Sequence, residues 1–232
     1  MLISIIIPTY NEQQLIVDLI NYLSKNGQGY ISEIIVANYG YEDETVNNLK
    51  DTDAIIVHCK QKSRAIQMNT GAKLAKGDVL YFVHADSYPP ITFAEDIITC
   101  ITKGYDCGRF KTKFSTNSLG LRFNAFFTQF DLFVCYGGDQ TFFITNSLFN
   151  NLHGYDETYK IMEDYHITTR AKKLGKYCVL QKNCIINTRK YDNNSWWQVM
   201  KANKKMIAMY KANENQNVMV TTYKNMLNNS NR

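Results

Sequence analysis

The chain has 232 residues, 45% of them hydrophobic and 20% charged, with a formal net charge of +5 at neutral pH. This length and composition suit one domain with a core of ordinary size. No run of basic residues exceeds two, so the charge does not indicate a nucleic-acid-binding protein, although it favours anionic ligands. The chain contains no uncharged apolar stretch near the roughly 18 residues of a membrane-spanning helix, and its apolar start is too short for a signal peptide. We therefore expect a cytoplasmic protein.

The six cysteines are scattered along the chain without a Cys-x-x-Cys pair, and most lie within apolar runs. This pattern indicates free, buried thiols in a reducing compartment. It indicates neither a disulfide framework nor a zinc site.

The first half of the chain alternates short apolar runs with amphipathic segments. The clearest run is Val79 to Val83, which is typical of a strand buried on both faces. Alternation at this spacing predicts βαβ crossovers and a mostly parallel central sheet flanked by helices, which is an α/β fold. The other strands are expected at Leu2 to Ile7, Glu33 to Ala37 and Ala54 to His58. Helices are expected from a cap at Asn11 to Gly27, between the second and third strands, from a cap at Ser63 to Lys76, and from a capping box at Thr92 to Thr102.

The second half continues with shorter strands and three longer helices. A partly polar strand, nearer an edge, is expected at Tyr105 to Phe114, and others at Thr141 to Ile144, Tyr177 to Gln181 and Cys184 to Asn187. Helices are expected at Leu119 to Val134, before His153-Gly154, from Met162-Glu163-Asp164 to Gly175, and at Trp196 to Lys211, ahead of a poorly ordered Asn-rich tail. Phenylalanines recur every three or four residues in the first of these helices. Such a stripe favours a core position over a surface that faces a membrane or an acceptor.

Polar side chains follow several of the expected strands at the point where each strand ends. Thr9 to Glu12 follow the first strand, Asn38 the second, and His84 and Asp86 the strand at Val79. Because the carboxyl ends of parallel strands share one edge, these groups are expected to line one pocket. Asp86 is then a candidate ligand of a metal or of a phosphate-bound cation. The alternative is that Asp86 is only a residue of a turn. Arg64, beside the same edge, suits a phosphate, and a solvated first-turn residue is the alternative.

Six motifs occur in a definite order along the chain. They are Ile5 to Glu12, Glu33 to Val36, Arg64-Ala65-x-Gln67-Met68-Asn69 to Asp78, His84-Ala85-Asp86, Gly138-Asp139-Gln140 and Met162-Glu163-Asp164. In this order they resemble family 2 glycosyltransferases with the GT-A fold, especially the bacterial branch that has His-Ala-Asp in place of Asp-x-Asp. Matching segments cover Ile3 to Lys190. The resemblance implies a glycosyltransferase domain over residues 1–190, with residues 191–232 belonging to it or forming an appendage.

The resemblance also implies an activity and a set of site residues. The activity is inverting transfer of a sugar from a nucleoside diphosphate sugar to a hydroxyl acceptor, assisted by Mn²⁺ or Mg²⁺. It assigns the donor site to Pro8, Tyr10, Glu12, Asn38, Arg64, Asn69, Asp86 and Arg189, the metal to Asp86 and His84, general-base chemistry to Asp164 with Glu163 beside it, and the acceptor side to Asp139 and Gln140.

The chain departs from the family pattern at two of these positions. Asn38 stands where relatives usually have an aspartate that reads the base, and the metal motif holds one carboxylate and an imidazole. A non-catalytic member that binds a nucleotide or scaffolds a partner is therefore an alternative. A nucleotidyltransferase is a second alternative, although the chain lacks a glycine-rich phosphate loop and paired metal carboxylates. The phenylalanine stripe and the basic helix from Trp196 permit a lipid-linked acceptor, peripheral attachment to the inner face of the membrane, or a homo-oligomer interface.

Overall fold

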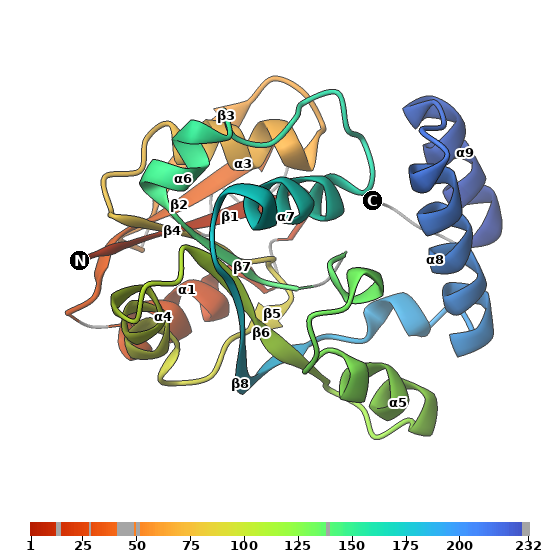
Figure 1. Cartoon of the computed structure of the whole chain (residues 1–232), viewed down its shortest axis with the longest axis horizontal. Helices are drawn as coiled ribbons and strands as arrows, with labels where there is room; N and C mark the ends of the chain where they lie inside the picture. Colours follow the sequence, from red (N-terminus) through yellow and green to blue (C-terminus); the bar gives the residue numbers. More distant parts are fainter. Residues whose placement is uncertain (13–14, 28, 41–48, 50–51, 138–139, 229–232) are drawn as a thin grey trace.

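The computed structural model describes residues 1–12, 15–27, 29–40, 49, 52–137 and 140–228. It confirms the expected α/β fold, with an eight-stranded sheet in the order β3-β2-β1-β4-β7-β6-β8-β5. Figure 1 shows helices on both faces of this sheet and a pair of helices, α8 and α9, at one end. In the polar segment between the second and third strands, where a short helix was expected, residues 41–48, 50 and 51 lie outside the described residues.

The first half of the chain forms the parallel part of the sheet. It contains β1 (Ile3–Thr9), β2 (Ile31–Tyr39), β3 (Ile55–Cys59) and β4 (Val79–Phe82). β1 lies in the middle, with Ile5 opposite Ile34 on one side and Tyr81 on the other. The carboxyl ends of β1, β2 and β4 therefore meet at one edge, as expected.

Two hydrophobic cores cover the two faces of the sheet. One face packs against α1 (Ile16–Asn26) and α4 (Phe93–Thr102), and Ile5 and Ile7 point into it. The other face packs against α3 (Arg64–Ala72), α6 (Asn146–Asn151) and α7 (Glu163–Leu174), around Ile6 and Phe82. Burial on both faces explains why these strands are apolar without alternation.

The second half of the sheet is mixed. β7 (Phe142–Thr145) is antiparallel to β4, and β6 (Cys107–Phe114) lies between β7 and β8 (Tyr177–Ile186). The expectation that β6 lies nearer an edge holds beyond its first two residues, because β7 pairs only with Cys107 and Gly108 while β8 continues beside the rest. Arg109 is buried there, and it donates to the Thr128 carbonyl oxygen at 2.7 Å. The two expected closing strands are one strand, β8, with an irregular register opposite Phe110 and Lys111. β5 (Ser87–Tyr88) pairs with its end.

Helix starts were predicted with mixed success. The Ser63 hydroxyl accepts from the Ile66 amide, which confirms the cap of α3. Asn11 is not a helix cap, because its φ is +54° and α1 begins only after Leu15. α4 begins at Phe93 as expected, but the Thr92 hydroxyl donates to the Asp96 carboxylate and does not cap the backbone.

The second half of the chain also contains α5 (Leu119–Phe127), the short turns η1 (Phe133–Cys135) and η2 (Arg189–Tyr191), α8 (Trp196–Lys211) and α9 (Gln216–Met226). The expectation of a poorly ordered tail was wrong over α9, because this helix packs on α8 around Met219. The core position favoured for the phenylalanine stripe is wrong for Phe123 and Phe126, which are each 58% exposed, whereas Phe133 packs against a hydrophobic cluster. The helix expected to reach Val134 ends at Phe127. In the described part of the chain, the helices are too short or too polar to cross a membrane. All six cysteines are free, as expected.

Candidate functional site

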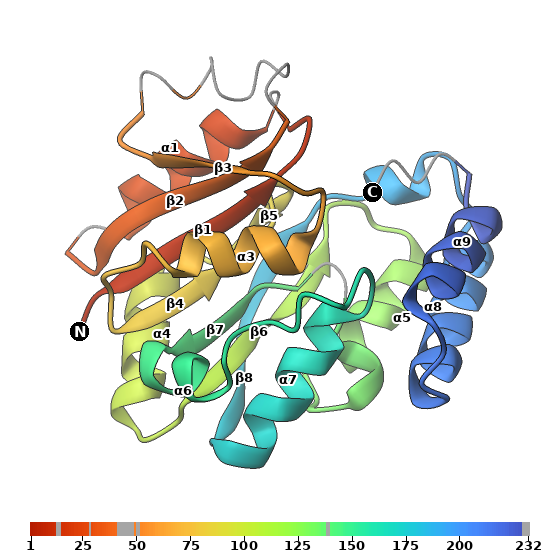
Figure 2. The ribbon, with the colours of Figure 1, turned by 90° about the horizontal axis from the view of Figure 1, so that it is seen from above.

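A pocket of about 550 Å³ opens at the carboxyl ends of β1 and β4. The start of α3 and the start of α7 form its walls, and α8 and α9 close it on the far side (Figure 2). Its volume lies within the range of small-molecule sites. The charged side chains that line it are Glu12, Lys62, Arg64, Asp86, Glu157, Lys160, Glu163, Asp164, Lys190 and Lys224.

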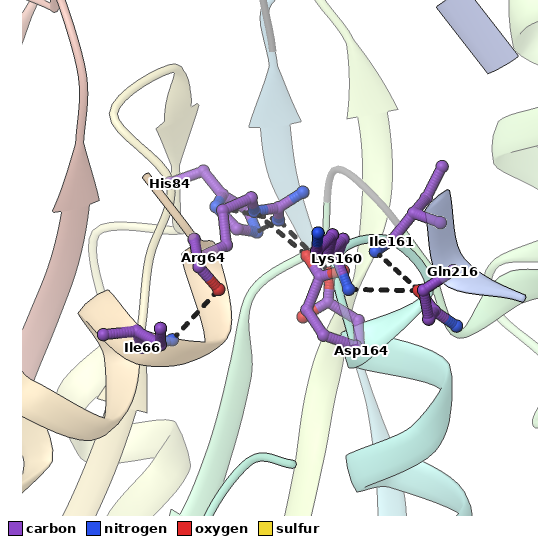
Figure 3. A network of polar contacts seen from close by, with 9 residues as sticks. Arg64, Ile66, His84, Lys160, Ile161, Asp164 and Gln216 are labelled. Carbon is purple, nitrogen blue, oxygen red and sulfur yellow. Dashed lines mark hydrogen bonds and ion pairs between the residues drawn. The ribbon is translucent and has the colours of Figure 1, made fainter. Parts of the chain in front are cut away.

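Arg64 joins three of the predicted site residues. Its Nη2 lies 3.2 Å from Oδ2 of Asp164, and its Nε lies 3.2 Å from Oε1 of Glu163. Nη2 also lies 2.7 Å from Nε2 of His84, so the guanidinium spans the gap between the β4 tip and α7 (Figure 3). The two carboxylate side chains are only 12% and 5% exposed, which strengthens their attraction to the cation.

Local backbone geometry produces this arrangement. Met162 has φ of +67°, a left-handed conformation that turns the chain sharply before α7. Glu163 and Asp164 then occupy the first turn of α7, where the helix dipole favours negative charge. Arg64 is in the first turn of α3, where the dipole disfavours a cation, so the two carboxylates offset that cost.

A buried tyrosine lies close to these carboxylates. Burial raises the pKa of Tyr155 well above its ordinary value, and the negative charges of Asp164 and Glu163 raise it further. Its ring packs edge-on against Phe82, with ring centroids 5.2 Å apart. Tyr155 therefore stays neutral and forms part of the apolar base beneath the charged network.

Asp86 lies in the tight turn between β4 and β5, where Ser87 N–H donates to the His84 carbonyl. Its Oδ2 is 3.8 Å from Nη2 of Arg189, and the same nitrogen is 2.9 Å from Oε2 of Glu12. Asp86 is thus both a residue of the turn and a residue that lines the pocket. The structure brings the tips of β1 and β4 and the η2 turn into one cluster of two carboxylates and one guanidinium.

Asp86 would suit a divalent cation whose other ligands do not come from the chain. Among the described residues, no group of three or more His, Cys, Asp and Glu side chains is arranged to hold a metal. Mg²⁺ and Mn²⁺ commonly use one or two carboxylates, with the remaining positions taken by phosphate oxygens and water. Asp86 suits such a site. His84 faces Arg64 instead, since Nη2 of Arg64 lies 3.2 Å from its Nδ1 and 2.7 Å from its Nε2, and its role as a metal ligand stays a prediction.

Pro8, Tyr10 and Glu12 line the pocket at the end of β1, where the donor site was expected. The Tyr10 ring lies 5.7 Å from that of Tyr39 at the end of β2, which makes an aromatic wall. Lys62 was not singled out from the sequence, yet its Nζ lies 3.6 Å from the centroid of the Tyr10 ring. A cation beside an aromatic wall suits a nucleotide, whose base stacks and whose phosphates are anionic.

Asn38 and Asn69 do not line the pocket with their side chains. Asn38 is fully buried, and its amide accepts from Thr9 Oγ1 at 2.9 Å and donates to the Gly40 carbonyl. Asn69 donates to the Tyr155 carbonyl oxygen at 2.8 Å and accepts from the Tyr155 amide, so it fixes the loop before α7. Both residues support the walls of the site, and a direct role in reading the donor remains a prediction.

The side chain of Gln67 holds the ends of β1 and β2 together. Its Nε2 donates to the carbonyl oxygens of Thr9 and Ala37 at 2.7 and 2.8 Å, which ties the two strand ends together.

Of the predicted acceptor-side residues, Asp139 lies outside the described residues. Gln140 is half-buried, and its Oε1 finds no hydrogen-bond donor in the described part of the chain.

The wall formed by α8 and α9 was missed by sequence reasoning. Met206, Val220, Tyr223 and Lys224 line the pocket from these helices. Gln216 Oε1 accepts from the amides of Lys160 and Ile161 at 3.0 and 3.2 Å, which anchors α9 to the loop before α7 (Figure 3). The available signal was Asn215, which caps α9, followed by Met219 and Tyr223 at helical spacing.

The chain is similar to several solved structures of sugar-transferring proteins, and the likeness confirms the GT-A fold. A mannosyltransferase from Pyrobaculum calidifontis, solved with GDP-Man and Mn²⁺, has a TM-score of 0.67 and 17% identity, over 90% of this chain and 63% of that one. TarS 1-349 from S. aureus has a TM-score of 0.65 and 17% identity, over 88% and 65%. A glucosyl-3-phosphoglycerate synthase from Mycobacterium tuberculosis, in complex with Mn²⁺ and UDP, has a TM-score of 0.60 and 15% identity, over 87% and 78%.

Sequence comparison agrees with the structural likeness. A dolichol-phosphate mannosyltransferase from Pyrococcus furiosus is 30% identical over 111 residues, which cover 46% of this chain and 32% of that protein. The chain thus aligns with about a third of the length of this curated relative. The family model described as glycosyl transferase family 2 matches residues 4–167, which include the strand tips, Arg64 and the start of α7. Since this match extends over more than half of the chain, the protein belongs to glycosyl transferase family 2.

Proposed function

We propose that the protein transfers a sugar from a nucleoside diphosphate sugar to a hydroxyl group of an acceptor, with inversion at the anomeric carbon. The observation that carries this proposal is the convergence of Asp86, Arg64 and Asp164 on one pocket at the strand ends. Asp86 follows β4 and Asp164 lies at the start of α7, so one carboxylate can serve the leaving group while the other serves the nucleophile. Membership of the family agrees with this division of roles.

The donor side of the pocket is assigned to the β1 and β4 tips. Tyr10 and Lys62 bind the nucleotide, and Asp86 holds the divalent cation on the diphosphate. The bound cation supplies neutralisation of the charge that develops on the leaving diphosphate. Arg189, which contacts both Glu12 and Asp86, adds a fixed positive charge beside the same oxygens.

The acceptor side is assigned to the start of α7. Asp164 accepts the proton of the acceptor hydroxyl. At the same time the oxygen of that hydroxyl bonds to the anomeric carbon, and the bond between this carbon and the diphosphate breaks. Arg64 keeps the carboxylate oriented through its contact with Oδ2. One displacement of this kind inverts the anomeric carbon, because the acceptor attacks from the side opposite the leaving group.

We also propose that the whole chain works as one unit. Residues 191–232 include α8 and α9, whose side chains line the same pocket as those of residues 1–190. Removal of these helices is therefore expected to expose the acceptor side to water.

A donor panel tests the proposed function. Thermal unfolding is measured with UDP, GDP, CDP, ADP and dTDP, each with and without Mn²⁺, followed by release of nucleotide from the matching sugar donors. We expect one nucleotide to raise the unfolding temperature more in the presence of Mn²⁺, and its sugar donor to release nucleotide at a slow rate without an acceptor. Absence of stabilisation by all five nucleotides, with and without metal, contradicts the proposal.

A further inference from the structure

Helix α5 presents an aromatic face to solvent. Leu119 is 80% exposed, Phe123 and Phe126 are each 58% exposed, and Phe130 just beyond the helix is 46% exposed. The phenylalanine rings form a continuous chain: Phe127 lies 4.9 Å from Phe123 and 5.5 Å from Phe126 between centroids, and Phe126 lies 5.7 Å from Phe130. Exposed phenylalanines that contact one another form an apolar patch, which usually marks an interaction site.

Cationic side chains lie on the same face. An open groove of about 750 Å³ runs between β6 and α5, and Lys111, Lys113, Arg122 and Phe126 line it together. Between Asp106 and Asp131 the sequence contains no acidic residue. The apolar patch is therefore bordered by positive charge that local carboxylates do not neutralise.

The aromatic surface continues toward the start of α8. A Cβ atom at Gly120 would lie 2.8 Å from the Trp196 ring, so α5 packs directly against that ring. Trp196 in turn contacts Trp197, with ring centroids 4.5 Å apart, and Trp197 is 68% exposed. Tryptophan favours the boundary between a bilayer and water. Figure 2 shows α5 and α8 side by side at the same end of the molecule.

We propose that this surface, the α5 patch (Leu119, Phe123, Phe126, Phe130, Lys111, Lys113 and Arg122), binds the surface of an anionic lipid bilayer. The phenylalanines enter the boundary between headgroups and acyl chains, and the groove cations contact acidic headgroups. A second copy of the chain fits less well. A two-fold contact through the patch would bring the cations of both copies into one interface, and the patch itself contains no carboxylate to pair with them.

The α5 patch connects to the pocket through the segment after α5. Phe133 packs on Tyr165, with ring centroids 5.3 Å apart, and Tyr165 follows Asp164. Gly137, at the end of the same segment, lines the pocket. Binding of α5 to a membrane would therefore bring the pocket close to the bilayer surface, where an acceptor with a lipid tail would be held.

Vesicle sedimentation tests the proposal without any transferase assay. The full chain is mixed at low salt with vesicles of phosphatidylcholine and phosphatidylglycerol, or with vesicles of phosphatidylcholine alone. We expect binding to the mixed vesicles that weakens as salt is added. F123Q/F126Q should lower the partition coefficient at least about tenfold, since two aromatic side chains leave the interface. K113Q/R122Q should remove most of the preference for the anionic lipid.

Matched variants identify the surface. Ile91 and Leu174 are 66% and 63% exposed outside the patch, so I91Q/L174Q tests the loss of exposed apolar area elsewhere. K25Q/K103Q, at exposed lysines of α1 and the end of α4, tests the loss of charge. Both control pairs should leave vesicle binding within about twofold of the unaltered protein. No binding to either vesicle overturns the proposal, as does an equal loss in patch and control variants. A dimer that F123Q/F126Q dissociates, without vesicle binding, would assign the patch to a second copy.

Discussion

The guanidinium of Arg64 lies 3.2 Å from the carboxylate of Asp164, across the pocket from the β4 tip. The same side chain contacts Glu163, which is also buried, so one cation from the start of α3 fixes both carboxylates of α7. Orientation by a bidentate cation is a common way to position a base before a substrate arrives.

Replacement of Arg64 should therefore lower turnover more than donor binding. We expect R64Q to reduce kcat about a hundredfold, because a misplaced base costs on that order. R64K keeps the charge but cannot contact Glu163, Asp164 and His84 together, so it should restore only part of the rate. Steady-state kinetics with the donor found in the panel provide the measurement. K103Q, at an exposed lysine at the end of α4, is the control, and a kcat for R64Q equal to that of K103Q would remove Arg64 from the mechanism.

Asp164 is the side chain assigned to the acceptor proton. D164N keeps the shape and the place at the start of α7 but cannot accept the proton, so we expect transfer to fall by about 10²- to 10⁴-fold. Nucleotide binding should stay within about threefold, since the donor site is assigned to the other wall. Calorimetric titration of nucleoside diphosphate beside the transfer assay separates the two effects. E163Q is the matched variant, because it changes the neighbouring carboxylate, which contacts Arg64 through Nε. Equal losses in D164N and E163Q would argue against a specific role for Asp164.

Asp86 is expected to make donor affinity depend on metal. D86N removes the charge while leaving the turn between β4 and β5 intact, so added Mn²⁺ should no longer raise nucleotide affinity. The remaining affinity should be the metal-free affinity of the unaltered protein or somewhat higher, because Arg189 loses a competing carboxylate. Nucleotide titrations with and without Mn²⁺ measure this difference. D18N, at an exposed carboxylate of α1, is the control. A manganese effect of undiminished size in D86N would refute the assignment.

The parallel half of the fold followed from the sequence because its signals are local. Uninterrupted apolar runs marked β1 and β4, and the cap at Ser63 marked α3. The partner of Arg109 could not be read in this way. Only the fold reveals that the Thr128 carbonyl oxygen accepts from this buried side chain.

Exposure of the phenylalanine stripe was beyond sequence reasoning for a similar reason. Helical spacing establishes that Phe123, Phe126 and Phe130 share a face, but it does not say whether another element covers that face. Prediction of the site had the same limit, because contacts between separate elements are not encoded in local patterns. Strand ends indicated which residues meet at one edge, whereas the contact between Arg64 and His84 depends on the distance between a helix start and a strand tip.

His166 should make α7 sensitive to acid. Its ring stacks on Tyr159 with centroids 4.2 Å apart. Burial lowers its pKa below the ordinary value of 6.5, and the charges of Arg170 and Lys173 lower it further, while Asp156 opposes them. The unfolded chain therefore binds a proton more readily than the folded chain. Stability from the neutral ring is fully present above about pH 6.5 and is lost as pH falls from there through the lower folded value.

H166Q removes this titration. We expect urea unfolding midpoints to fall less between pH 7 and pH 5 for H166Q than for the unaltered protein. Subtracting one pH profile from the other removes groups common to both proteins. L174Q, at an exposed leucine of the same helix, is the control and should keep the full pH dependence. Transfer activity measured over the same range would report whether loss of α7 packing reaches Asp164. Parallel profiles for H166Q and the unaltered protein would contradict the prediction.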